Sequence, residues 1–208
     1  MDFVPFDTVG LTASQFDDFF QTYNALKAKF NIQPTGNIDF HLDDFESFKS
    51  YTGVKLRGSF VIKECKNDCY ILFVEVHHTT LKNGKGGYTA HHQDFQTWAI
   101  AYLKEDFGRV LIRRETLTDK IVELVHPVEI DFAEDKAFSD TFYVLANDHQ
   151  KAIAGMNRNF RNAVMDIRAD DFVIEINEYS LLIGNRHTIS PEKSLHLAEF
   201  IERVASRC

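Results

Sequence analysis

The sequence contains no apolar run long enough to cross a membrane. The longest nearly uncharged runs lie around Cys69–Val74 and Phe95–Leu103, far short of the roughly 20 residues that a membrane-spanning helix requires. The first ten residues have neither a basic region nor a long apolar stretch, so no signal or transit peptide is predicted. We therefore expect a chain with no membrane segment, located in the cytoplasm.

Positive charge is also scarce. Lysine and arginine number 23 against 31 aspartates and glutamates, which gives a formal net charge of −8. Arg113 and Arg114 form the only basic doublet. Because nucleic acids and anionic membranes attract basic surfaces, this balance argues against both as partners.

Cysteine is rare, with three residues in the chain: Cys65, Cys69 and Cys208. Three cysteines cannot all pair within one chain, and without a secretory signal the expectation is reduced thiols in a reducing compartment. Cys65 and Cys69 are four positions apart, but no second cysteine pair is present to complete a structural zinc site.

Large apolar residues, in contrast, are plentiful. The chain has 208 residues, of which 44% are hydrophobic, and it contains 19 phenylalanines against one tryptophan. A chain of this size can bury a sizeable core, and that core should be largely aromatic.

Helical periodicity marks three segments. Thr12 to Gln15 has the form of a capping box and precedes apolar residues at helical spacing up to Phe30. Asp148 occupies an N-cap position before a second stripe that ends at Ile167, and Ser190 caps a third helix that starts with proline. We expect one amphipathic helix in each segment.

Between these helices the apolar residues alternate with period two, as expected for strands. The expected strands span 54–64, 68–80, 89–103, 109–115, 128–132, 142–146, 172–177 and 180–184. Segment 38–51 fits a short helix or an edge strand, and segment 116–125 a short helix or a connection. Segment 89–103 also fits a helix on spacing alone, but the β-formers in its second half favour a strand. The connections between the middle strands are too short for helical crossovers. The predicted fold is therefore α+β, a curved antiparallel sheet with flanking amphipathic helices, as one domain (37–208) after an N-terminal helical extension (1–36).

The clearest fold signature is the strand–helix stretch from Val128 to Ile167, whose marker residues are Phe138, Phe142, Val144 and Asp148. Packing explains the apolar residues and helix capping explains Asp148. This F-x-x-x-F-x-V-x-x-x-D pattern resembles an uncharacterised bacterial domain family of unknown function, whose members are often tethered to a membrane. The resemblance implies a soluble α+β domain and transfers no catalytic residue.

The candidate for chemistry is a histidine-rich hairpin. His77-His78 and His91-His92 flank the glycine-rich turn 83–87. A hairpin symmetric about Gly84-Lys85 would place His77 opposite His92, with Glu75 and Asp94 on the same face. Imidazoles and carboxylates together suit zinc or another divalent ion. Exposed histidines at strand ends are the alternative explanation.

Other catalytic patterns are missing from the sequence. The glycine-rich turn lacks the spacing of a phosphate-binding loop, and no serine nucleophile elbow is present. We therefore assign no catalytic residue and no bound cofactor apart from the possible metal. The first hypothesis is a non-enzymatic interaction or regulatory domain that binds a protein partner or itself. The alternatives are a small-ligand binder with an aromatic-lined pocket between sheet and helices, and a metal-binding protein or enzyme.

Overall fold

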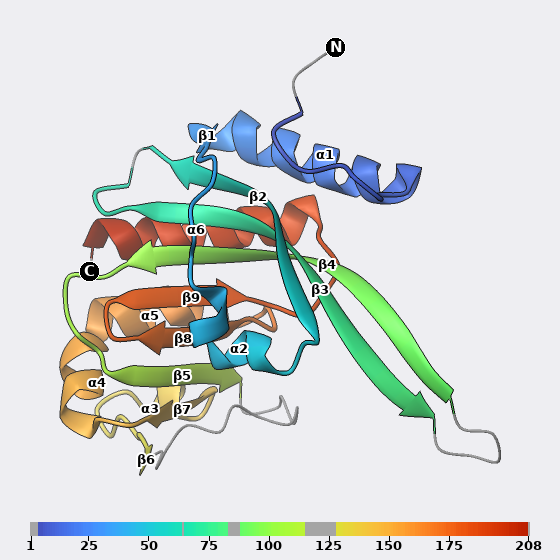
Figure 1. Ribbon diagram of the computed structural model, residues 1–208. Coiled ribbons are helices and arrows are strands. Elements are labelled where there is room, and N and C mark those ends of the chain that lie inside the picture. Colours follow the sequence, from blue (N-terminus) through green and yellow to red (C-terminus); the bar gives the residue numbers. More distant parts are fainter. Residues whose placement is uncertain (1–3, 64, 83–87, 115–127, 208) are drawn as a thin grey trace.

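The protein is built on one antiparallel sheet of nine strands, in the order β1-β2-β3-β4-β9-β8-β5-β7-β6 (Figure 1). The computed structural model describes residues 4–63, 65–82, 88–114 and 128–207. The strands are β1 (Ile32–Pro34), β2 (Gly53–Ile62), β3 (Cys69–Lys82), β4 (Tyr88–Tyr102), β5 (Arg109–Arg114), β6 (Val128–Glu129), β7 (Phe142–Ala146), β8 (Val173–Asn177) and β9 (Ser180–Gly184). The described strands form an antiparallel sheet that does not close into a barrel, and helices flank it. This arrangement confirms the predicted α+β fold with a curved antiparallel sheet.

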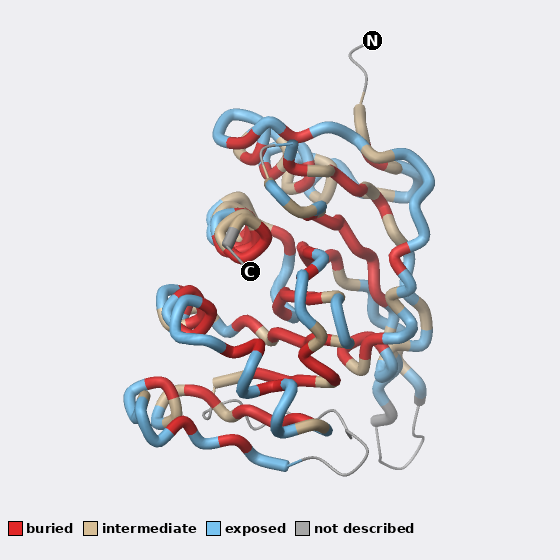
Figure 2. The backbone as a smooth tube through the Cα atoms, turned by 90° about the vertical axis from the view of Figure 1, so that its left-hand side faces the viewer, coloured by how far each residue is buried: buried red, intermediate tan, exposed pale blue. Residues whose placement is uncertain are grey.

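The helices lie mainly on one face of this sheet, called here the helical face (Figures 1 and 2). They are α1 (Ala13–Lys29), α3 (Lys136–Ser139), α4 (His149–Gly155), α5 (Arg158–Asp166) and α6 (Pro191–Arg207). The opposite face, called the outer face, is crossed by a segment with a 3-10 turn, η1 (Leu42–Asp44), and the short helix α2 (Glu46–Lys49). None of the helices in the described part of the chain is long and apolar enough to span a membrane.

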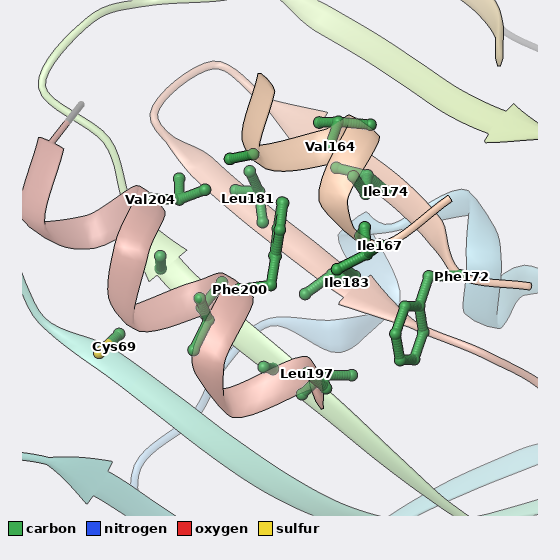
Figure 3. Close-up of a cluster of buried hydrophobic side chains, with 14 of the residues drawn as sticks. Cys69, Val164, Ile167, Phe172, Ile174, Leu181, Ile183, Leu197, Phe200 and Val204 are labelled. Atoms are coloured by element: carbon green, nitrogen blue, oxygen red, sulfur yellow. The ribbon is translucent and has the colours of Figure 1, made fainter. Parts of the chain in front are cut away.

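A continuous core fills the space between the sheet and the helical face. Figure 3 shows α6 directing Leu197, Phe200 and Val204 towards side chains of α5 and strands β8 and β9. Phe19 and Leu26 of α1 belong to the same core and are fully buried. Helix α1 shares this core with later elements, and β1 pairs with β2 in the same sheet.

The outer face has its own smaller core around Trp98. The ring of Phe48 from α2 lies 4.8 Å from the Trp98 ring, measured between centroids. Trp98 in turn covers Gly184 of β9, where a built Cβ would fall 2.3 Å from the indole. Glycine at position 184 therefore provides the space that the indole occupies.

A buried carboxylate attaches α2 to the sheet. Glu175 of β8 accepts hydrogen bonds from the backbone N–H groups of Glu46 and Ser47, at 2.7 and 2.9 Å, and from the Ser47 hydroxyl at 2.8 Å. Burial raises the pKa of the Glu175 carboxyl, although the hydrogen bonds from Ser47 and Glu46 oppose that effect.

Two expectations about local structure were wrong. The helix expected from Asp148 to Ile167 is two helices, because Asn157 begins a new one by accepting from the N–H groups of Asn159 and Phe160. Gly155, at the end of α4, lies against the Phe107 ring.

The second correction concerns the cysteines. Cys65 and Cys69 form a disulfide, with a Cα–Cα distance of 6.5 Å, rather than the expected reduced thiols. The bond joins Cys65, in the connection after β2, to Cys69, the first residue of β3. Cys208 lies outside the described residues.

The remaining elements follow the expected pattern in part, since β1 and α3 were not predicted. The capping box at Thr12 is present, with Thr12 and Gln15 bonded in both directions. Segment 38–51 holds η1 and α2 instead of an edge strand. The strand expected at 128–132 is confined to Val128–Glu129, and segment 116–125 lies outside the described residues.

Candidate functional site

The edge of the sheet at β2 is only partly covered by β1. The register of β1 on β2 runs from Ile32 opposite Ile62 to Pro34 opposite Phe60. Thr35 extends the pairing by one step, since its N–H donates to the Ser59 carbonyl at 3.0 Å. Beyond this point the chain leaves the edge, and the remaining half of β2 has no β1 partner.

The N-terminal strap, Val4–Gly10, covers the next position on this edge. The Asp7 N–H donates to the carbonyl of Arg57 at 2.6 Å. The Asp7 carboxylate lies 2.6 Å from the Lys55 ammonium and 2.9 Å from the Arg57 guanidinium, which also donates to the Val9 carbonyl at 2.7 Å. Lys55, the Val9 N–H and Arg57 together hold the pKa of Asp7 below its ordinary value. The strap is therefore fixed by main-chain and ionic contacts together.

The Arg57 guanidinium extends from the strap into the interior of the molecule. Arg57 and Glu75 form a buried ion pair, each side chain being 4% exposed. Burial opposes ionisation of Glu75, but hydrogen bonds from Arg57, Gln93 and His77 outweigh it and lower the pKa of this carboxyl. A buried charge pair of this kind is costly to break, because removal of one partner leaves the other uncompensated.

Phe6 anchors the strap in the aromatic core. Its ring lies 5.3 Å from that of Phe19 and 6.1 Å from that of Phe73, between centroids. Gly58 allows this approach, since a built Cβ there would fall 2.9 Å from the Cβ of Phe6. Gly58 follows the irregularity in the β2–β3 register between Leu56 and Gly58, called here the β2 bulge.

A groove opens beside the strap, and we call it the β2-edge groove. It consists of a cavity of about 690 Å³ and a neighbouring one of about 310 Å³, which share Ile38, Asp39 and Leu56 in their linings. The strap forms one wall of the larger cavity, the segment after β1 forms the other, and β2 from Leu56 to Ser59 forms the floor. The smaller cavity lies between segment 38–43 and the side chains of Val54 and Leu56. The lining mixes apolar side chains with carboxylates.

The predicted histidine site lies elsewhere, on the long β3–β4 ribbon that extends from the body of the sheet (Figure 1). The expected register was wrong by one residue: His77 pairs with Gln93, and His92 pairs with His78. Because side chains alternate along a strand, His77 and Glu75 lie on one face of the ribbon while His92 and Asp94 lie on the other. The structure therefore does not bring the four predicted residues together.

Each half of that set has its own contacts. His77 Nε2 lies 2.7 Å from a Glu75 carboxylate oxygen. On the other face the His78 and His92 rings stack at 4.9 Å, His92 Nε2 lies 2.9 Å from the Thr80 hydroxyl, and His78 Nδ1 lies 3.4 Å from Asp94. The described residues contain no group of three or more histidine, cysteine or acidic side chains placed to hold a metal ion.

The residues of the central motif occupy structural positions. Phe138, Phe142 and Val144 are buried in the core of the helical face. The Asp148 carboxylate accepts from the N–H groups of Gln150 and Lys151, at 3.0 and 3.1 Å, as an N-cap does.

Comparison with known proteins adds information about the fold. No family model matches the sequence, and no curated protein matches it. The structure is similar to the crystal structure of the mycobacterial trehalose monomycolate transport factor A, TtfA, with a TM-score of 0.56 and 8% sequence identity. The match covers 93% of this chain and 94% of TtfA. At that identity the similarity concerns the fold alone.

Sequence patterns did not identify the β2-edge groove. The strap has no helical or strand periodicity, and Arg57 and Glu75 are separated by 18 positions with no spacing motif. The one available signal was Gly58, a glycine inside a strand, because such a residue often marks a bulge or a close approach of another chain segment.

Proposed function

We propose that this protein is a non-enzymatic binding domain whose site is the β2-edge groove. The observation that supports it is the groove itself, with a cavity of about 690 Å³ between the strap and the segment after β1. A lining that combines apolar surface with a few fixed polar groups is typical of recognition sites. The buried Arg57–Glu75 pair and the Phe6 anchor hold one wall in place, so the site is formed before any ligand arrives.

A protein partner is the first candidate ligand, as expected from the sequence, and a small molecule is the second. The cavity volume lies within the roughly 300–1,000 Å³ of small-molecule sites. This site is at the sheet edge, with Phe6 as the aromatic residue of the larger cavity, and differs from the expected pocket between sheet and helices.

The groove can be tested by NMR titration of the ¹⁵N-labelled protein with a library of small fragments and short peptides. We expect binders to shift the amide signals of Leu56–Ser59 and Gly36–Asp39. Ile38→Arg should abolish these shifts, since Ile38 borders both cavities. Ile153→Arg is the matched control, because the two isoleucines are similarly exposed, at 38% and 41%, and Ile153 lies on α4. Binders that map only outside the groove, or none at all, would overturn the proposal.

Three earlier expectations stay predictions. They are binding of a divalent metal at the histidine-rich ribbon, membership of the uncharacterised bacterial family, and location in the cytoplasm. The Cys65–Cys69 disulfide argues against the last of these, because disulfides are rare in reducing compartments.

A further inference from the structure

From the open half of strand β2 we infer the class of ligand that the β2-edge groove takes: an extended protein segment of alternating apolar and basic residues, which pairs with β2 as an additional strand. The inference rests on the proposed function, since it specifies the occupant of the same groove. Three features carry it: the direction of the β2 backbone groups, the apolar side chains beside them, and the charge around them.

On the side of the β2 bulge that β1 and the strap cover, hydrogen bonds show which way the main-chain groups of β2 point. The carbonyl oxygens of Ser59 and Arg57 point away from β3, because they accept from Thr35 at 3.0 Å and Asp7 at 2.6 Å. Hydrogen-bonding groups alternate in direction along an antiparallel strand. Gly58 therefore faces β3.

The bulge shifts this alternation by one residue. Gly58, on one side of the bulge, pairs with Phe73, and Lys55, on the other side, pairs with Glu75. Since Phe73 and Glu75 are two positions apart on β3, they face the same neighbour, and Lys55 faces β3 as well. Val54 and Leu56 consequently direct their N–H and C=O groups to the open edge. Within the described residues, no main-chain hydrogen bond reaches these outward groups.

Edge groups of this kind are where an extended peptide adds a strand. β1, Thr35 and the strap already use the edge in this way, from Ile62 to Arg57. The next two outward positions, Leu56 and Val54, line the groove. A bound segment would continue the edge pairing that the chain itself begins.

The side chains at the open positions favour apolar residues on one side of the ligand. Val54 and Ile38 are 37% and 38% exposed and, with Leu56, line the smaller cavity. Because side chains alternate along a strand, every second residue of a paired segment would contact this apolar surface.

The charge around the groove favours basic residues. Asp39 and Asp43 are exposed on its lining, and no lysine or arginine among the described residues pairs with them. His41 Nδ1 lies 3.7 Å from the Asp39 carboxylate, a contact that carries positive charge only when the imidazole is protonated. The cations nearby are already engaged, Lys55 by the strap and Arg57 by the strap and Glu75. The uncompensated charge at the groove is therefore negative, and complementarity selects a cationic ligand.

The test uses an acetylated, amidated heptapeptide that alternates valine with lysine. Two control peptides have the same length: one replaces lysine by glutamate, and one carries N-methyl groups on the amides that would pair with β2. We expect saturable binding of the lysine peptide and slower hydrogen exchange of the Val54 and Leu56 amides in the complex. The N-methylated peptide should bind about tenfold more weakly, because main-chain hydrogen bonds are lost. The glutamate peptide should bind at least about tenfold more weakly, because it meets like charge.

Matched variants separate the local charge from the net charge of the chain. The double substitution Asp39→Asn and Asp43→Asn should lower the affinity for the lysine peptide several-fold. Asp131→Asn with Asp140→Asn removes the same charge from exposed positions outside the groove lining and should leave the affinity unchanged.

The outcomes distinguish the inference from the function on which it rests. If fragments bind the groove but the lysine peptide does not, or if N-methylation has no effect, the strand-addition inference fails and the binding function stands. If no probe of either kind reaches the groove, both fail.

Discussion

The two faces of the sheet are covered in different ways. On the helical face, helices from both ends of the chain form one continuous core that includes the Phe6–Phe19–Phe73 cluster. On the outer face the buried side chains form two separate smaller clusters, one around Trp98 and one around Leu111. The first of these is covered by the segment that contains η1 and α2.

The two layers are held in position by different kinds of interaction. Regular helices bury their apolar stripes on the helical face, so periodicity and packing fix their positions together. The outer segment has little regular structure, and its position depends on particular contacts such as the Glu175 carboxylate and the Phe48–Trp98 ring pair. Stability should therefore be concentrated on the helical face, while the outer face should respond more to individual substitutions and to pH.

The largest effect is expected from Phe19→Ala. Phe19 is fully buried between α1 and the sheet, with ring contacts to three other phenylalanines. We expect a loss of about 3–5 kcal/mol in the free energy of unfolding, measured by denaturant titration, since a large cavity is left in a close-packed core. Phe48→Ala on the outer face is the matched substitution and should cost less, because an irregular segment relaxes more readily into the space. An equal or greater loss for Phe48→Ala would contradict the comparison.

A smaller, pH-dependent effect is expected from Glu175→Gln. Burial raises the pKa of Glu175 in the folded state, so folding favours its neutral form. This stabilisation is complete below the ordinary pKa of about 4.3 and is lost as the pH rises through the raised value. The unfolding free energy of the native protein should therefore fall relative to that of the variant as the pH increases above about 4.3. Denaturant titrations of both proteins across this range would measure it, and parallel pH profiles would rule out the assignment.

The smallest effect is expected from Asn157→Ala on the helical face. Asn157 caps α5 through hydrogen bonds to the N–H groups of Asn159 and Phe160, at 3.0 and 3.1 Å. Loss of an N-cap costs about 1 kcal/mol. Asn159→Ala removes an exposed asparagine of the same helix that is not its cap, and should stay within about 0.5 kcal/mol of the native protein in the same unfolding assay. Similar losses in the two variants would show that the cap is not the cause.

The sequence predicted the helical face better than the outer face. The stripes of α1 and α6 and the caps at Thr12 and Asp148 were readable, because helix packing and capping use local, periodic signals. The break at Asn157 was hidden inside a stripe that continues across it. The fold class followed from short strand connections, since these exclude parallel crossovers.

The candidate sites were harder to predict for a physical reason. The pairing of His78 with His92 instead of His77 with His92 is a difference of one residue in the register of β3 on β4, and such a shift moves side chains to the opposite face. The β2-edge groove depends on the strap, whose contacts with Arg57 are tertiary. Neither feature has a local pattern from which it could be derived.

The strand order has a consequence for how the molecule is made. β9 lies in the middle of the sheet, where it joins β4 to β8 and pairs Trp98 with Gly184, although eight of the described strands are synthesised before it. Until Ser180–Gly184 leaves the ribosome, no described strand connects β1–β4 to β5–β8. Folding of the complete sheet must therefore wait for Ser180–Gly184 and close long loops, which favours a slow last folding step. During that wait the edge of β4 that later pairs with β9 lacks this partner, and an unpaired strand edge of this kind is prone to pair with another chain.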